Sequence, residues 1–254
     1  MIKNRVKEMI KKGEVTYGAW IGIGHPDVAE ILSTLGLDWL VFDTEHAPLY
    51  FETVQKMMQA IRDPNLTPIT RVAWNDPVLI KLALDIGSLG IIVPWINNKE
   101  EAIKAVKAKL YPPKGIRGVG PRRAARYGAD FQEYVKVADE EILLLVQIET
   151  QEAVKNIDDI LSVEGVDAFF IGPLDLSASL GYIGDWRNPK VLETIDKILD
   201  AGKRNGVPGG IYAMDIEHAK ECTKKGFKFI ALGSDYKFLK AGCLSALEAV
   251  KKIS

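Results

Sequence analysis

The strongest constraint on the fold is a regular alternation of short apolar runs and amphipathic stretches along the 254-residue chain. Apolar runs rich in Val, Ile, Phe and Leu are typical of buried parallel strands. Eight runs are predicted as strands: residues 16–23, 38–45, 67–73, 90–96, 142–149, 168–173, 209–213 and 227–233. A helical pattern follows each run: residues 27–35, 51–62, 77–86, 99–109, 152–161, 189–205, 216–225 and 236–252.

Eight strand–helix repeats predict an α/β fold, a single-domain (β/α)8 TIM barrel that spans residues 1–254. Such a barrel typically needs about 250 residues. An open sheet that binds a dinucleotide would carry a Gly-rich fingerprint after its first strand. Residues 22–26 read Gly-Ile-Gly-His-Pro, which is not that fingerprint. A long connection, residues 111–128, precedes a short helix predicted near residues 131–138.

Composition excludes several classes of partner. The formal net charge is -1, so bulk electrostatics favours neither nucleic acid nor an anionic membrane. Residues 1–12 lack the apolar core of a signal peptide, and no apolar run approaches membrane-spanning length, which predicts a cytoplasmic location. Cys222 and Cys243 are predicted as reduced packing residues, and His218 as a solvated surface residue.

Candidate functional residues follow the apolar runs, because chemistry in this fold lies at the carboxyl ends of the strands. Polar side chains gather at these positions: Asp43, Glu45, His46, Arg71, Gln147, Glu149 and Asp175. The sequence therefore predicts that charged groups from several strands meet at one rim of the barrel.

Glu149 and Asp175 are candidate metal ligands. Gln147 and Glu149 are two apart on a strand, so they share a face, and burying a carboxylate there without a partner is costly. Asp175 follows the neighbouring strand, which lies about 4.8 Å away. Two carboxylates with open positions suit a hard ion such as Mg²⁺ or Mn²⁺. The alternative is a structural ion pair, for example between Glu149 and Arg71.

His46 and Arg71 are candidates for proton transfer and anion binding. His46 follows an acidic strand end and precedes Pro48, and histidine is readily poised for proton transfer near neutral pH. Arg71 lies in an apolar run and needs an anionic partner. A substrate carboxylate, a developing enolate oxygen or Glu149 would each serve.

Five segments carry a resemblance to a known family: residues 38–48 (DWLVFDTEHAP), 74–77 (WNDP), 115–120 (GIRGVG), 146–150 (VQIET) and 163–177. Together they resemble the HpcH/HpaI class of 4-hydroxy-2-oxo-heptanedioate and 2-keto-3-deoxyglucarate aldolases. The resemblance implies a metal-dependent aldolase that cleaves or forms 4-hydroxy-2-keto acids, giving pyruvate and a small aldehyde through a pyruvate enolate. No run ends in an inward-facing lysine, so an imine mechanism is disfavoured.

The resemblance also implies residue roles. Glu149 and Asp175 would ligate a divalent ion (Mg²⁺, Mn²⁺ or Co²⁺), and Arg71 would stabilise the enolate. His46 would handle protons together with Asp85, whose counterpart in the family comes from a neighbouring subunit. The residues expected to contact pyruvate are Gln147, Gly172, Pro173 and Leu174. Asp43 is expected to support the residues that make these contacts. The family implies a homo-oligomer, a hexamer built as a trimer of dimers, with the last helix exchanged between subunits.

Two alternatives stay open at this stage. The first is a lyase that acts on acyl-CoA thioesters, as in citrate-lyase-like relatives, although the sequence shows no nucleotide motif. The second is a non-catalytic oligomer that binds keto acids. Thr44 stands where many family members have glycine, and such departures leave the aldehyde unassigned. Arg122 and Arg123 either bind an acidic aldehyde or pack the long loop at a subunit contact.

Overall fold

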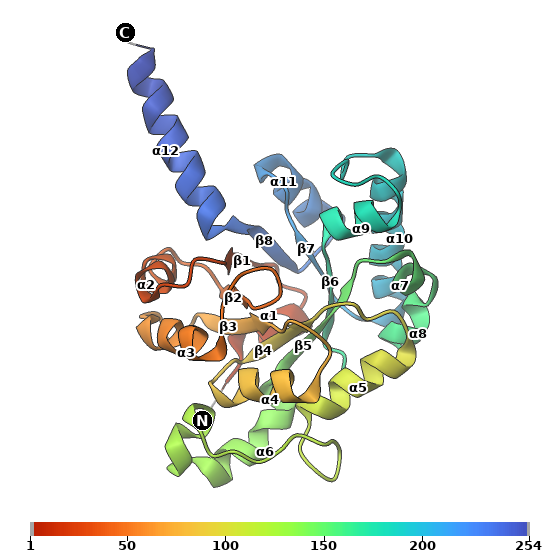
Figure 1. Cartoon of the computed structure of the whole chain (residues 1–254). Helices are drawn as coiled ribbons and strands as arrows, with labels where there is room; N and C mark the ends of the chain where they lie inside the picture. The colour runs from red at the N-terminus through yellow and green to blue at the C-terminus, as the bar shows by residue number, and fades with distance from the viewer. Residues whose placement is uncertain (1–2, 253–254) are drawn as a thin grey trace.

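The computed structural model describes residues 3–252 and shows a closed barrel of parallel strands in the order β1 to β8 (Figure 1). The strands are β1 (Thr16–Ile21), β2 (Trp39–Asp43), β3 (Thr67–Arg71), β4 (Gly90–Val93), β5 (Leu143–Ile148), β6 (Ala168–Ile171), β7 (Gly209–Tyr212) and β8 (Phe229–Ser234). The barrel closes where β1 pairs with β8. The predicted (β/α)8 fold is therefore confirmed.

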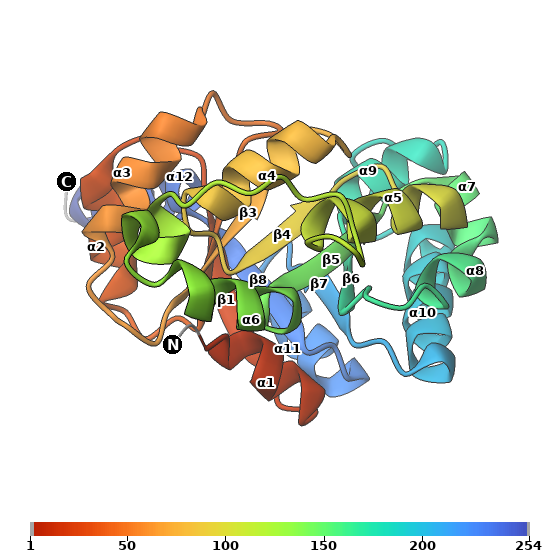
Figure 2. The same cartoon turned by 90° about the horizontal axis from the view of Figure 1, so that it is seen from below.

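Helices surround the barrel (Figures 1 and 2). They are α1 (Arg5–Lys11), α2 (Pro26–Ser33), α3 (Phe51–Ala60), α4 (Pro77–Asp85), α5 (Lys99–Lys109), the 3₁₀ segment η1 (Arg123–Gly128), α6 (Phe131–Glu141), α7 (Gln151–Lys155), α8 (Ile157–Leu161), α9 (Pro173–Ser179), α10 (Pro189–Asn205), α11 (Ile216–Lys225) and α12 (Asp235–Lys251). The bounds of α5, α10 and α11 are the same in the prediction and in the structure.

The structure differs from the prediction in three respects. The predicted helix at 152–161 is two short helices, because Asn156 leaves helical geometry at φ -99° and ψ 13°. The predicted strands run past the paired residues on their carboxyl side in most cases, since the chain leaves the sheet there to form the rim. Helices α1 and α9 were not predicted.

Helix α1 closes the amino-terminal end of the barrel. Val6 and Ile10 pack into the cluster of side chains that fills the barrel interior. Lys7 donates to the carbonyl of Ile142 at 2.8 Å and pairs with Asp167 at 2.8 Å. These contacts fasten α1 across the amino-terminal end of the barrel.

Aromatic rings fill the barrel above α1. The rings of Trp39 and Phe229 stack with centroids 3.7 Å apart, and Trp20 stacks on Phe170 at 4.9 Å. Gly18 is required beside them, because a Cβ there would lie 2.1 Å from the Trp39 ring. These rings form a floor beneath the carboxyl-terminal rim.

Helix α12 extends away from the barrel (Figure 1) and exposes large apolar side chains: Phe238, Leu239, Leu244, Leu247 and Val250. Cys243 of this helix is exposed, so its prediction as a buried packing residue is wrong for the single chain, whereas Cys222 is buried. Within residues 3–252, no helix is long and apolar enough to cross a membrane.

One polar prediction is also corrected. His218 is buried rather than solvated, because its Nδ1 accepts the Met214 N–H at 3.1 Å and its ring packs 4.6 Å from Trp186. Arg123 binds its own chain, donating to the carbonyl of Ile86 at 2.9 Å. This contact fastens the long loop to the end of α4.

Candidate active site

Arg71, the last residue of β3, is held by the neighbouring strand β2. Its Nε and Nη2 donate to the two carboxylate oxygens of Asp43 at 2.9 and 2.7 Å. The register places Asp43 directly beside Arg71. The partner of this guanidinium is thus Asp43, and the proposed structural pair with Glu149 is not the arrangement observed.

Glu45 is the second carboxylate beside Arg71. Its Oε2 lies 3.1 Å from Arg71 Nη1, and its side chain is only 9% exposed. Burial raises the pKa of Glu45 to about 8, against the opposing effect of Arg71, and the nearby Glu149, Asp43 and Asp175 raise it further. Glu45 had no predicted role, and its spacing of two residues from Asp43 is the signal in the sequence that places both side chains on one face.

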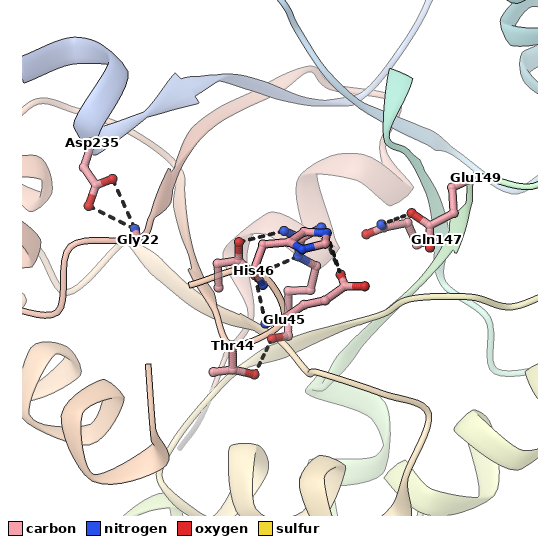
Figure 3. A network of polar contacts seen from close by, with 9 residues as sticks. Gly22, Thr44, Glu45, His46, Gln147, Glu149 and Asp235 are labelled. Carbon is pink, nitrogen blue, oxygen red and sulfur yellow. Dashed lines mark hydrogen bonds and ion pairs between the residues drawn. The ribbon is translucent and has the colours of Figure 1, made fainter. Parts of the chain in front are cut away.

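Gln147 and Glu149 face this cluster from β5 (Figure 3). The Gln147 amide donates to Glu149 Oε2, and both side chains are buried. Gln147 Oε1 is buried and has no hydrogen-bond partner in residues 3–252. Burial raises the pKa of Glu149, and the nearby charge of Asp175 raises it further.

Gly172 marks the point where the polar groups of β5 and α9 converge. A Cβ placed on Gly172 would lie 3.2 Å from Asp175 Oδ2, 3.7 Å from Glu149 Oε2 and 3.8 Å from Gln147 Nε2. Asp175 is in the first turn of α9, directly after β6. The carboxylates of Glu149 and Asp175, the two candidate metal ligands, therefore both lie within 4 Å of this point.

Trp95 positions Glu149 through its backbone. Its N–H donates to Glu149 Oε1 at 2.9 Å, and its φ of 55° is in the left-handed region that non-glycine residues rarely adopt. This hydrogen bond holds Oε1 of Glu149, while Oε2, which accepts from the Gln147 amide, lies on the side of Gly172. No pattern in the sequence indicated it.

The structure does not bring His46 and Asp85 together. The His46 side chain is 61% exposed at the rim, and its Nε2 lies 4.0 Å from Glu45 Oε2. Asp85 ends α4, where Arg117 Nη2 donates to its carboxylate at 3.1 Å. Burial raises the pKa of Asp85, and Arg117 opposes that effect. The described part of the chain therefore shows no His46–Asp85 contact.

A cavity of 230 Å³ opens among these residues. Predicted site residues line it: Asp43, His46, Arg71, Gly172, Pro173, Leu174 and Asp175. Residues without a predicted role form its other walls: Trp20, Tyr212, Ser234, Tyr236 and Lys237. Tyr212 and Lys237 belong to β7 and α12, so the last quarter of the chain also shapes the site.

Comparison with known proteins is consistent with this geometry. The family model for HpcH/HpaI aldolase/citrate lyase matches residues 16–241. A 4-hydroxy-2-oxo-heptane-1,7-dioate aldolase of Escherichia coli is 42% identical over 236 residues, covering 92% of this chain and 90% of that protein. A pyruvate aldolase of Rhizobium etli is 42% identical over 240 residues, covering 94% of each.

A solved structure shares the whole architecture. An HpcH/HpaI aldolase/citrate lyase family protein from Burkholderia cenocepacia superposes with a TM-score of 0.95 at 35% identity, covering 98% of this chain and 100% of that one. The chain belongs to the HpcH/HpaI aldolase/citrate lyase family. It is an enzyme of the aldolase/lyase type, as the sequence predicted, and the family is typically dependent on a divalent metal.

Proposed function

We propose that this enzyme cleaves or forms 4-hydroxy-2-keto acids, giving pyruvate and an aldehyde, with a divalent cation as cofactor. The observation that carries this proposal is the meeting of Glu149 and Asp175 in front of Gly172, where a Cβ would lie within 4 Å of both carboxylates. The names of the 42%-identical relatives support the same reaction class.

The residues in front of Gly172 fit a hard divalent ion. Carboxylate oxygens are the preferred ligands of Mg²⁺ and Mn²⁺, and two of them leave positions open for water and substrate oxygens. Burial and the nearby charge of Asp175 raise the pKa of Glu149, and a cation between the two carboxylates would favour the charged form of Glu149. Glu149 and Asp175 would hold Mg²⁺, Mn²⁺ or Co²⁺. Such an ion supplies Lewis-acid polarisation of the keto group.

Arg71 would stabilise the negative charge of the enolate. A guanidinium has five N–H donors, and the hydrogen bonds to Asp43 use two of them. Both hydrogens of Nη1 and one hydrogen of Nη2 are left for a substrate oxygen. Because Asp43 holds the guanidinium by two hydrogen bonds, Arg71 is fixed before substrate binds, which is the arrangement that favours electrostatic catalysis. The buried amide of Gln147 and the segment Gly172–Leu174 would contact pyruvate.

His46 would transfer the proton of the 4-hydroxyl group, with Asp85 of a neighbouring subunit orienting its ring. Two features support a homo-oligomer. The apolar side chains of α12 are exposed in the single chain, and exposed apolar patches mark interfaces. Asp85 also lies outside the cavity that His46 lines. We propose a hexamer, a trimer of dimers with α12 exchanged. A cytoplasmic location remains a prediction from the sequence.

Exchange of the pyruvate methyl protons in heavy water tests the proposed reaction. Exchange requires enolate formation but no aldehyde, so it isolates this half of the reaction. We expect exchange with Mg²⁺ or Mn²⁺ and its loss with a chelator. Binding of pyruvate without exchange would instead indicate the non-catalytic alternative. Turnover of malyl-type thioesters, but not of free hydroxy-keto acids, would indicate the acyl-CoA alternative.

A further inference from the structure

The cavity of the candidate active site has a second cationic wall, formed by Lys237 in the first turn of α12. Lys237 Nζ lies 4.7 Å from the centre of the Tyr212 ring. Tyr212 in turn packs edge-on against Trp20 at 5.7 Å, and Arg71 lies 5.7 Å from the Trp20 ring. Arg71 and Lys237 therefore lie beside different rings of one aromatic pair.

The two cations differ in their partners. Arg71 is neutralised by the carboxylate of Asp43. Lys237 forms no ion pair with any carboxylate in residues 3–252, although it is half-buried. A partly desolvated ammonium without a partner is unfavourable, and an anion bound in the cavity would remove that cost.

Two further polar groups near Lys237 also lack partners. The hydroxyl of Tyr212 and Oγ of Ser234 are buried, line the cavity, and have no hydrogen bond within the described residues. Hydroxyl groups are donors that can complete the coordination of a carboxylate. The wall around Lys237 therefore has one positive charge and two hydroxyl groups available for a ligand.

We propose that Lys237 binds an anionic group at the far end of the aldehyde, so that the enzyme selects aldehydes carrying a carboxylate. This inference rests on the proposed function, in which pyruvate occupies the region of Arg71, Glu149 and Asp175. A second carboxylate in this cavity would be repelled by Asp43, Glu45, Glu149 and Asp175 without a nearby cation. Lys237 supplies that cation on the wall away from the proposed pyruvate site.

The test compares two aldehydes of equal length, succinic semialdehyde and butanal, in metal-loaded enzyme with saturating pyruvate. Wild-type enzyme should prefer succinic semialdehyde in kcat/KM. The neutral variant Lys237→Met should lower that preference by about 10- to 100-fold, the range of one charge-assisted contact. Lys237→Arg keeps the positive charge and should therefore retain most of the preference for succinic semialdehyde. Lys224→Met, at the far end of α11, is the matched control and should leave the preference unchanged.

Proton exchange of pyruvate is measured on every variant, because it needs no aldehyde. If wild-type enzyme exchanges protons but shows no preference, or if Lys237→Met lowers kcat/KM equally for both aldehydes, the role of Lys237 is wrong while the proposed function stands. If wild-type enzyme shows no exchange, the proposed function itself is wrong, and the role of Lys237 is overturned with it.

Discussion

Glu45 Oε2 lies 3.1 Å from Arg71 Nη1, yet burial and three neighbouring carboxylates raise the pKa of Glu45 to about 8. The nearby guanidinium, which Asp43 holds with two hydrogen bonds, lowers the pKa of Glu45 but offsets only part of this effect. Without a divalent cation, the acidic groups of the site therefore outnumber its positive charges, and Glu45 keeps its proton at neutral pH.

This relationship predicts how stability depends on pH in metal-free protein. Between pH 4.5 and about 8 the folded state keeps a proton on Glu45 that the unfolded state has lost. The free energy of unfolding therefore falls as pH rises through this window. We expect the free energy of unfolding of Glu45→Gln to fall less between pH 5 and 9 than that of wild type. Urea unfolding with a chelator present measures it. Glu52→Gln changes an exposed side chain and is the control, so its free energy of unfolding should fall as much as that of wild type. An identical dependence of unfolding free energy on pH in all three proteins would refute the prediction.

The pair between Asp43 and Arg71 should contribute to both stability and catalysis. Both side chains are 9% exposed, so Asp43→Asn leaves a buried guanidinium without its charge partner. Breaking such a pair costs about 3 kcal/mol in the free energy of unfolding, and a mobile Arg71 should lower kcat/KM at least tenfold. Urea unfolding and steady-state kinetics measure the two effects. Asp158→Asn removes an exposed pair with Arg204 and should change the unfolding free energy by less than about 1 kcal/mol.

The separation of Asp85 from His46 predicts complementation between subunits. His46→Ala and Asp85→Asn should each lose most turnover while pyruvate still binds, since neither residue contacts the proposed metal ligands. Mixed oligomers refolded from the two variants should regain part of the wild-type rate, because some sites then receive an intact His46 from one chain and an intact Asp85 from the next.

Mixed oligomers no more active than the separate variants would show that the two residues do not act together across an interface. Refolding two batches of the same variant provides the control. Size-exclusion chromatography of each sample confirms that a lost rate reflects chemistry rather than failed assembly.

The sequence predicted the barrel and much of the site because both follow from periodic patterns. Alternation of apolar and amphipathic segments defines the strands, and the rule that chemistry lies at strand ends locates Arg71, Glu149 and Asp175. Other features depend on packing across the barrel. The left-handed Trp95, whose N–H binds Glu149, and Lys237, which reaches the cavity from α12, become recognisable only when the barrel closes. His218 was misplaced because its helix is rich in charged residues, while its own face is buried.

Binding of Mn²⁺ tests the central claim most directly, measured by titration calorimetry on metal-free protein with and without pyruvate. We predict one Mn²⁺ per chain in wild type, tighter binding when pyruvate is present, and loss of binding in both Glu149→Ala and Asp175→Ala. Circular dichroism would show that the variants remain folded. Wild-type affinity and stoichiometry in either folded variant would contradict the assignment of these two carboxylates as the ligands.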